Sequence, residues 1–261
     1  MSDWDAAQYH KVSDPQREWG VRVLDRLAPR HGEVILDVGC GTGRLTAAIA
    51  ERVSAPDGRA CRNVAIDRSA AMLREARAHF GGMIHFAQAD GASLPFRDAA
   101  FDAVLSTATF HWIDDHELLF SEIYRVLKPG GRLVSQCGGG PNLQMLYRRA
   151  RDLRSSGVYA PYFTAWADPW NFATAEQTIA RLRAAQFDDI DVNLEPARTP
   201  FPDIDAYEAF VTTVCLRHHV DKLPAELGQS FVHQLALAAA DDNPPLTLDY
   251  WRLNADAIKR R

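Results

Sequence analysis

The segment VILDVGCGTG, from Val34 to Gly43, joins an apolar run to a glycine-rich turn. The run contains Asp37 near its end, and the segment from Arg44 to Arg52 has the composition of a helix. This order predicts a buried strand, a tight turn and a helix whose first N–H groups point at a ligand. Glycines allow that ligand to lie against the backbone, where a Cβ would collide with it. For this segment alone, an ordinary glycine-rich turn is the alternative.

Three classes of ligand use such a unit of strand, turn and helix, and the neighbouring residues separate them. A P-loop requires Lys and then Ser or Thr after its last glycine, whereas Arg44 and Leu45 stand here. The dinucleotide fingerprint requires glycine at the position of Arg44, where the helix packs closely on the strand. This chain instead places acids at three predicted strand ends, namely Asp37, Asp67 and Asp90.

These three carboxylates indicate the charge of the ligand. Like charges at close range in a poorly solvated site would repel a diphosphate by several kcal/mol. They suit a ligand with a cationic amine and ribose hydroxyls but no phosphate, a description that S-adenosylmethionine fits. Asp67 closes the predicted strand 64–67, where an acid accepts hydrogen bonds from a ribose diol, and Asp90 could accept from an adenine amino group. Taken singly, each aspartate could instead cap a turn or a helix.

Eight segments stand in order along the chain: WDAAQY (4–9), LDVGCGTG (36–43), AIDRSAAML (65–73), QADGASLPF (88–96), FDAVLSTATFHWIDD (101–115), RVLKPGGRLV (125–134), DPWNF (168–172) and DYWRL (249–253). In this order they resemble the class I S-adenosylmethionine-dependent methyltransferases, specifically the small-molecule group called type 11 that includes the trans-aconitate methyltransferases. The resemblance covers nearly the whole chain. It is specific for the cofactor and the reaction type, and much less so for the substrate.

The resemblance implies a Rossmann-like α/β fold, with a seven-stranded, mostly parallel sheet and helices on both faces. The implied strand order is 3-2-1-4-5-7-6, with strand seven antiparallel. Tyr9 and Gln16 belong to an N-terminal segment that would fold over the cofactor, with a surface helix as the alternative. The implied cofactor-binding residues are Tyr9, Gln16, Asp37, Gly39, Cys40, Gly41, Gly43, Asp67, Arg68, Met72, Asp90, Gly91 and Thr107.

Apolar strands alternate with amphipathic helices from Val21 to about Val134, as in a parallel sheet wrapped by helices. We expect a single domain with a core of about 20–137, 176–195 and 246–258, and a helical cap from 1–19, 138–175 and 203–240. Ser69 and Thr174 are predicted helix caps. The expected strands are 34–38, 64–67, 84–89, 103–106, 132–136, 190–194 and 246–253; other expected helices are 44–52, 117–127 and 143–155.

Methyl transfer from a sulfonium is an in-line displacement, so the protein mainly positions the acceptor and excludes water, which can supply roughly 7–11 kcal/mol. In this fold the residues after strand four face the methyl group, which singles out Thr107, His111 and Trp112. A hydroxyl or carbon acid would need a general base, and His111 is the candidate; a packing role is its alternative. A carboxylate with a pKa near 4 would need none.

The trans-aconitate-like resemblance favours a carboxylate acceptor and a methyl ester product. Such an acceptor requires cationic partners in the cap, although most charged helix positions are simply solvated. Alternatives are methylation of a malonyl group on a carrier protein, and a non-catalytic module that binds S-adenosylmethionine. An NAD-dependent oxidoreductase is disfavoured by Arg44 and by the acidic pocket. The available cap cations are Arg148, Arg149, Arg151, Arg154, Arg198, Arg217, His218 and His219.

Composition and net charge limit the kinds of partner that the protein is expected to bind. A chain of 261 residues with a net charge of −5 can bury a full core and does not attract nucleic acid or an anionic membrane. Its four cysteines lack metal-ligand or disulfide spacing, and no apolar stretch approaches the roughly 20 residues that cross a bilayer. The first residues do not read as a signal peptide. We expect a cytoplasmic enzyme with a small-molecule substrate, no metal, and an oligomeric state that the sequence leaves open.

Overall fold

A computed structural model describes residues 14–53 and 63–261 of the chain, with side chains from Trp19 onward in the first helix. Its main sheet has seven strands, and two short strands pair separately. The strands of the main sheet are β1 (Ile35–Val38), β2 (Val64–Asp67), β3 (His85–Gln88), β4 (Phe101–Thr107), β5 (Leu127–Gly138), β6 (Phe187–Pro196) and β9 (Trp251–Lys259); the short pair is β7 (Thr199–Pro200) and β8 (Thr247–Leu248).

The helices predicted at 44–52, 117–127 and 143–155 begin and end within one residue of these bounds. Ser69 accepts a hydrogen bond from the N–H of Met72, and Thr174 forms a reciprocal capping box with Gln177, so both predicted caps are confirmed. The helices are α2 (Asp14–Leu27), α3 (Arg44–Val53), α4 (Ala70–Phe80), η1 (Phe110–Trp112), α5 (His116–Val126), α6 (Gln144–Arg154), η2 (Ala160–Tyr162), α7 (Ala175–Ala184), α8 (Ile204–Phe210), the π-helical turn η3 (Val211–Cys215), α9 (Arg217–Val220) and α10 (Ala225–Ala240).

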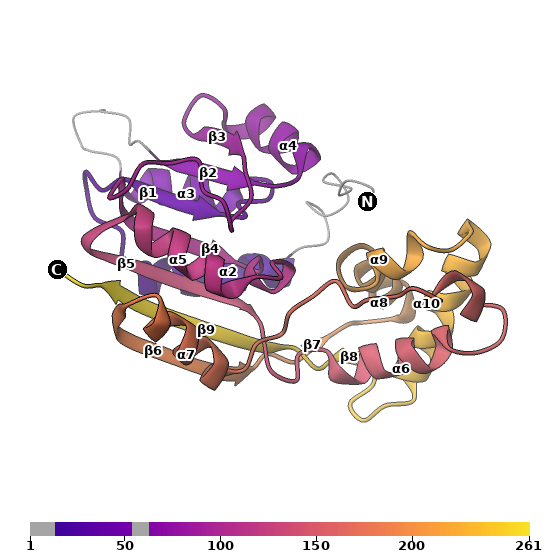
Figure 1. Ribbon diagram of the computed structural model, residues 1–261. Helices are drawn as coiled ribbons and strands as arrows, with labels where there is room; N and C mark the ends of the chain where they lie inside the picture. The colour runs from indigo at the N-terminus through magenta and orange to yellow at the C-terminus, as the bar shows by residue number, and fades with distance from the viewer. Residues whose placement is uncertain (1–13, 54–62) are drawn as a thin grey trace.

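The strand order of the main sheet is β3-β2-β1-β4-β5-β9-β6. The first five strands pair in parallel, and β9 is antiparallel to both β5 and β6. In Figure 1 the parallel strands run toward the helices on the right, whereas β9 runs the opposite way to the C-terminus. The fold and strand order implied by the resemblance are therefore confirmed, with β9 in the place of strand seven.

Several expected boundaries were wrong: the strands expected at 132–136 and 190–194 span Leu127–Gly138 and Phe187–Pro196, and the strand expected at 246–253 begins at Trp251. The helix expected to end at Leu127 ends at Val126, because the backbone at Leu127 is extended and pairs with Phe101 as the start of β5. The last strand does not end at Leu253 but continues to Lys259, because it hydrogen-bonds to β5 on one side and β6 on the other. Both errors concern pairing between segments far apart in the chain, which a local pattern does not contain.

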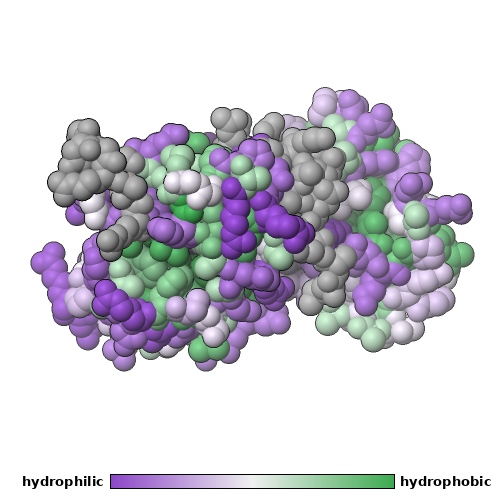
Figure 2. Space-filling view, turned by 90° about the horizontal axis from the view of Figure 1, so that it is seen from above, coloured by the Kyte–Doolittle hydropathy of each residue, from purple (hydrophilic) through white to green (hydrophobic). Residues whose placement is uncertain are grey.

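The helices α6, α8, α9 and α10, with η2 and η3, form a group that we call the cap. The cap has an apolar core of its own, in which Phe231 and Val211 are fully buried, and Leu248 and Tyr250 join it from the segment before β9. Figure 1 shows the cap beyond the carboxyl ends of the parallel strands, and Figure 2 shows two masses that both expose some apolar residues on a mostly hydrophilic surface. Among residues 14–53 and 63–261, no helix has the length and apolar character that crossing a membrane requires.

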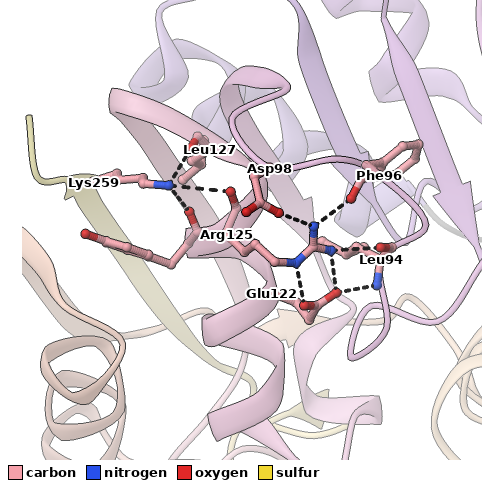
Figure 3. A network of polar contacts seen from close by, with 8 residues as sticks. Leu94, Phe96, Asp98, Glu122, Arg125, Leu127 and Lys259 are labelled. Carbon is pink, nitrogen blue, oxygen red and sulfur yellow. Dashed lines mark hydrogen bonds and ion pairs between the residues drawn. The ribbon is translucent and has the colours of Figure 1, made fainter.

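Arg125, at the end of α5, fixes the loop that follows β3 (Figure 3). Its guanidinium donates two hydrogen bonds of 2.8 Å to the carboxylate of Glu122 and others to the carbonyls of Leu94 and Phe96 and to Asp98. Glu122 also accepts from the N–H of Leu94 at 2.8 Å. The fork of a guanidinium can satisfy these acceptors together, so this loop, which begins at the end of β3, is held against α5.

We expect Arg125→Lys to lower the free energy of unfolding by about 1–3 kcal/mol, because a single ammonium cannot replace the fork and leaves backbone carbonyls unpaired. Urea denaturation of the two proteins measures the difference. Arg260→Lys is the matched control, because Arg260 pairs with Asp188 at an exposed position. Equal loss in both variants would contradict a special role for Arg125.

Candidate functional site

A cavity of about 490 Å³ lies at the carboxyl edge of the sheet. Its walls come from the loops after β1, β2, β3 and β4, together with α9 of the cap. The carboxyl ends of parallel strands meet at one edge, and the chain crosses to either side of β1 there, which is where open α/β sheets bind ligands. Another cavity, of about 430 Å³, lies beside the exposed Asp188–Arg260 pair and contains none of the predicted site residues.

The glycine turn after β1 gives the cavity a wall of bare backbone. Gly41 lines the cavity, its φ is +55°, and a Cβ added there would meet no atom within 4 Å. Gly39 also lines it, but a Cβ there would lie 2.1 Å from Oγ1 of Thr109, so glycine is required for packing against the loop after β4. Gly43 is not part of the lining, and its backbone faces the ring of Phe86.

Asp67 is held in place by the backbone around it. Its Oδ2 accepts a hydrogen bond of 2.9 Å from the N–H of Gly41, and its Oδ1 accepts one of 2.8 Å from the N–H of Ser69. The half-buried carboxylate also lines the cavity. Asp90 lines it too, is exposed, and accepts a hydrogen bond of 2.9 Å from the N–H of Ala92. Both acids therefore offer oxygens to a ligand.

Asp37 does not line the cavity but lies buried behind it, one residue before Val38, which does. Its Oδ2 accepts a hydrogen bond of 2.6 Å from the hydroxyl of Thr46. Burial, aided by repulsion from Asp67, raises the pKa of Asp37 to about 7. Cys40 is also outside the lining, and burial and the same two acids raise its thiol pKa, so it is no nucleophile. Of the three acids expected at one site, two therefore line the cavity and Asp37 lies behind it.

The remaining predicted residues supply the apolar and polar walls. Met72 is buried and lines the cavity. Gly91 lines it as well, and a Cβ there would lie 2.9 Å from Cδ1 of Ile113, so glycine lets Ile113 approach. Thr107 and the exposed Arg68 line it from the ends of β4 and β2. Tyr9 lies outside the described residues. Of Gln16, only the helical backbone is described.

His111 does not line the cavity. It is buried in contact with the rings of Trp112 and Phe172, and its Nδ1 accepts a hydrogen bond of 3.2 Å from the N–H of Gly138. Burial, with the nearby charge of Arg252, lowers the pKa of His111 to about 3. The lone pair that a general base needs accepts this hydrogen bond, so the geometry favours the packing alternative for His111 over the catalytic role.

The lining residues Thr109 and Ile113 were not singled out from the sequence, and Arg217 and His218 were named only within a larger set of candidates. Thr109 and Ile113 carry no polar motif of their own, and only the packing of the loop after β4 brings them to the cavity. Arg217 and His218 of the cap also line it, and the ring of His218 lies 5.3 Å from that of Trp112. Both were among eight candidate cap cations, but no spacing rule selects them. Their position depends on how the cap folds.

The cavity therefore combines carboxylates, bare backbone and an apolar wall. Asp67 and Asp90 favour hydroxyl, amino or cationic groups, Gly41 accommodates close approach, and Met72 and Ile113 accept a flat apolar ring. Among residues 14–53 and 63–261, no group of three or more His, Cys, Asp or Glu side chains is placed to hold a metal ion. These groups suit a nucleoside that carries a positive charge.

Known proteins share this sequence and fold. Residues 36–135 match the family described as "Methyltransferase domain". A trans-aconitate 2-methyltransferase of Acidovorax sp. (strain JS42) is 30% identical over 235 residues, which are 89% of this chain and 87% of that protein. A malonyl-[acyl-carrier protein] O-methyltransferase of Hahella chejuensis is 38% identical, but over 49% of this chain and 45% of its own.

The architecture also matches solved structures. The YcgJ protein from Bacillus subtilis superposes with a TM-score of 0.63 at 19% identity and covers 93% of this chain and 97% of its own. That likeness concerns the fold, while the alignment with the Acidovorax protein extends through the sheet and the cap. The chain therefore belongs to the class I S-adenosylmethionine-dependent methyltransferases, in the type 11 group that includes the trans-aconitate methyltransferases.

Proposed function

We propose that this protein methylates a carboxylate of a small molecule and forms a methyl ester, with S-adenosylmethionine as the donor. The observation that carries the proposal is the distribution of charge around one cavity. Asp67 and Asp90, together with the exposed Arg68, line the side formed by β2 and β3 and leave it with an excess of acidic groups, whereas Arg217 and His218 line the side where the cap meets the loop after β4. A cationic donor suits the first side and an anionic acceptor suits the second.

The cavity fits the donor in two respects. The bare backbone at Gly41 leaves room for a ligand that a Cβ would exclude, and the burial of Asp37 close to Asp67 leaves negative charge that a cation relieves. In this arrangement Asp67 accepts hydrogen bonds from the ribose hydroxyls and Asp90 from the adenine amino group. The rest of the proposed contact set is Gly39, Arg68, Met72, Gly91 and Thr107, with Tyr9 and Gln16 as a covering segment and Cys40 and Gly43 shaping the turn from behind.

The proposed reaction requires little acid–base catalysis from the protein. When bound, S-adenosylmethionine supplies an electrophilic methyl group and a neutral thioether leaving group. A carboxylate is ionised at neutral pH, so the acceptor needs no general base, in keeping with the buried position of His111. The acceptor is then oriented, and water is kept out of the cavity, by Thr107, Trp112 and Ile113.

The relatives support a small acceptor more than a carrier-bound one. A trans-aconitate 2-methyltransferase of Methylobacterium radiotolerans is 30% identical over 94% of this chain, whereas the malonyl-carrier methyltransferases match about half of it. Docking of an acidic carrier protein would need an exposed basic patch on the cap. Arg149 is not available for one, because both of its terminal nitrogens bond to Asp242. A cytoplasmic location is part of this proposal, since Cys137 and Cys215 are buried free thiols.

Asp67→Ala is expected to weaken the binding of S-adenosylhomocysteine at least about tenfold, or about 1.4 kcal/mol, because the variant loses the ribose acceptor and the anchor of Gly41. Isothermal titration calorimetry measures the dissociation constants. Asp152→Ala, at an exposed position of α6, is the control and is expected to bind as the wild type does. Unchanged affinity in Asp67→Ala would remove Asp67 from the ribose role.

The raised pKa of Asp37 predicts a pH dependence of donor binding. Below about pH 7 the free protein holds Asp37 protonated, and a bound cation favours its ionised form, so binding releases a proton. The affinity for S-adenosylmethionine should therefore rise as the pH rises toward about 7 and level off above that pH. The total rise is about tenfold for each unit by which the bound cation lowers the pKa of Asp37.

Calorimetry between about pH 5.5 and pH 8 tests this dependence in the wild type and in Asp37→Asn. Titration of the donor itself is common to both proteins, so the difference between the two profiles reports Asp37. The variant is expected to show the shallower profile. Identical profiles would mean that the cation does not reach Asp37.

A direct test of the proposed function is a screen with a radiolabelled methyl donor. We expect transfer to small carboxylic acids, trans-aconitate among them, and a product that is hydrolysed by mild alkali as a methyl ester is. Phenols, malonyl-carrier protein and a reaction without acceptor are run beside them. Preferred methylation of the carrier, with Arg148→Glu slowing only that reaction, would favour the alternative enzyme; donor binding without any transfer would favour a binding module.

A further inference from the structure

The cap brings α9 directly to the cavity. Arg217 and His218, the first two residues of α9, line it together with residues of the sheet. The side chain of Arg217 is only 11% exposed, so its charged group is enclosed between the cap and the sheet. Trp112, which follows β4, faces His218 from the other wall, with 5.3 Å between the ring centroids. The wall near the loop after β4 is therefore cationic and aromatic.

The backbone before α9 sets the direction of these side chains. Between α8 and α9 the chain makes the π-helical turn η3, and the N–H of Leu216 bonds to the carbonyl of Val211 at 2.6 Å. The wider turn interrupts the helix and starts α9 in a new direction, and π-helical turns are frequent at functional sites. Successive residues of a helix are about 100° apart, so Arg217 and His218 face the cavity while His219 points into the cap.

His219 anchors α9 in the core of the cap. It is fully buried and lies 4.4 Å from the ring of Trp166, 5.7 Å from that of Phe231 and 5.9 Å from that of Phe163, measured between centroids. Its Nε2 lies 3.4 Å from a guanidinium nitrogen of Arg154. Because His219 is fixed by these contacts, it holds the two preceding residues, Arg217 and His218, at a defined position over the cavity.

The charges around His218 show which kind of group this wall receives. Burial lowers the pKa of His218 and the guanidinium group of Arg217 lowers it further; Asp221 opposes this shift, and Arg68, across the cavity, adds the smallest lowering effect. Two guanidinium groups thus act on one imidazole that lines the cavity. Asp221 lies on the same helix as Arg217, and their side chains are 3.6 Å apart. Arg217 therefore brings positive charge to this wall, and Asp221 offsets part of it.

The geometry points to Arg217 as the residue that anchors a carboxylate of the methyl acceptor, with His218 and Trp112 forming the wall against which the acceptor lies. This inference rests on the function proposed above and names the specificity-determining group for it. A planar guanidinium binds carboxylates with paired hydrogen bonds. Because such pairing makes a carboxylate less nucleophilic, the anchored group is one that does not itself accept the methyl.

Steady-state kinetics with the best carboxylate from the screen tests the role of Arg217. Arg217→Gln is expected to raise KM for the acceptor at least about tenfold, to leave kcat within a few-fold, and to leave the dissociation constant of S-adenosylhomocysteine unchanged. Arg217→Lys should recover part of the loss, because it keeps the charge without the fork. Arg183→Gln, at an exposed position of α7 outside the cavity lining, is the matched control and should behave as the wild type.

A second comparison changes the acceptor instead of the protein. Acceptors in which one non-reacting carboxylate is replaced by an amide should lose affinity in the wild type and lose little in Arg217→Gln, because the partner is already absent. An unchanged KM in Arg217→Gln, or equal losses in both proteins, would overturn the role of Arg217 while the methyl ester product leaves the proposed function intact. Failure of the wild type to methylate any carboxylate would overturn the proposed function and this inference with it.

Discussion

The pairing of the Asp67 carboxylate with two backbone N–H groups is the constraint on which this site depends. One oxygen holds Gly41 in the turn after β1, and the other holds Ser69 at the start of α4. The N–H groups of Gly39 and Cys40 bond to the carbonyl of Ile66 in addition. The end of one strand, the turn of its neighbour and the start of a helix are therefore fixed relative to one another, so the wall of the cavity is ordered before a ligand arrives.

Much of the fold could be predicted because its signals are local. The apolar run before the glycine turn, the caps at Ser69 and Thr174 and the alternation of strands and helices each lie within a few neighbouring residues, and the structure confirms them. Gly41, Asp67 and Asp90 line the cavity for the same reason, since the ends of adjacent parallel strands must meet at one edge of the sheet.

The rest depends on contacts between distant segments. His111 has the sequence position of a catalytic base, but Gly138, which follows it by 27 residues, takes its Nδ1, and Phe172 packs on its ring. Arg217 looks like any other charged residue of a helical insertion. A turn at η3 and the burial of His219 place it at the cavity. Neither outcome follows from the type or spacing of the residues concerned.

The separate apolar core of the cap has an evolutionary consequence. Because the apolar core of the cap, which includes Phe231, is separate from the core under the sheet, substitutions in the cap can reshape the proposed acceptor wall while the wall formed by the sheet keeps its packing. Selection can then act on the two walls independently. With the walls assigned as proposed above, a lineage built in this way can acquire new acceptors by altering one lobe while the other keeps the donor.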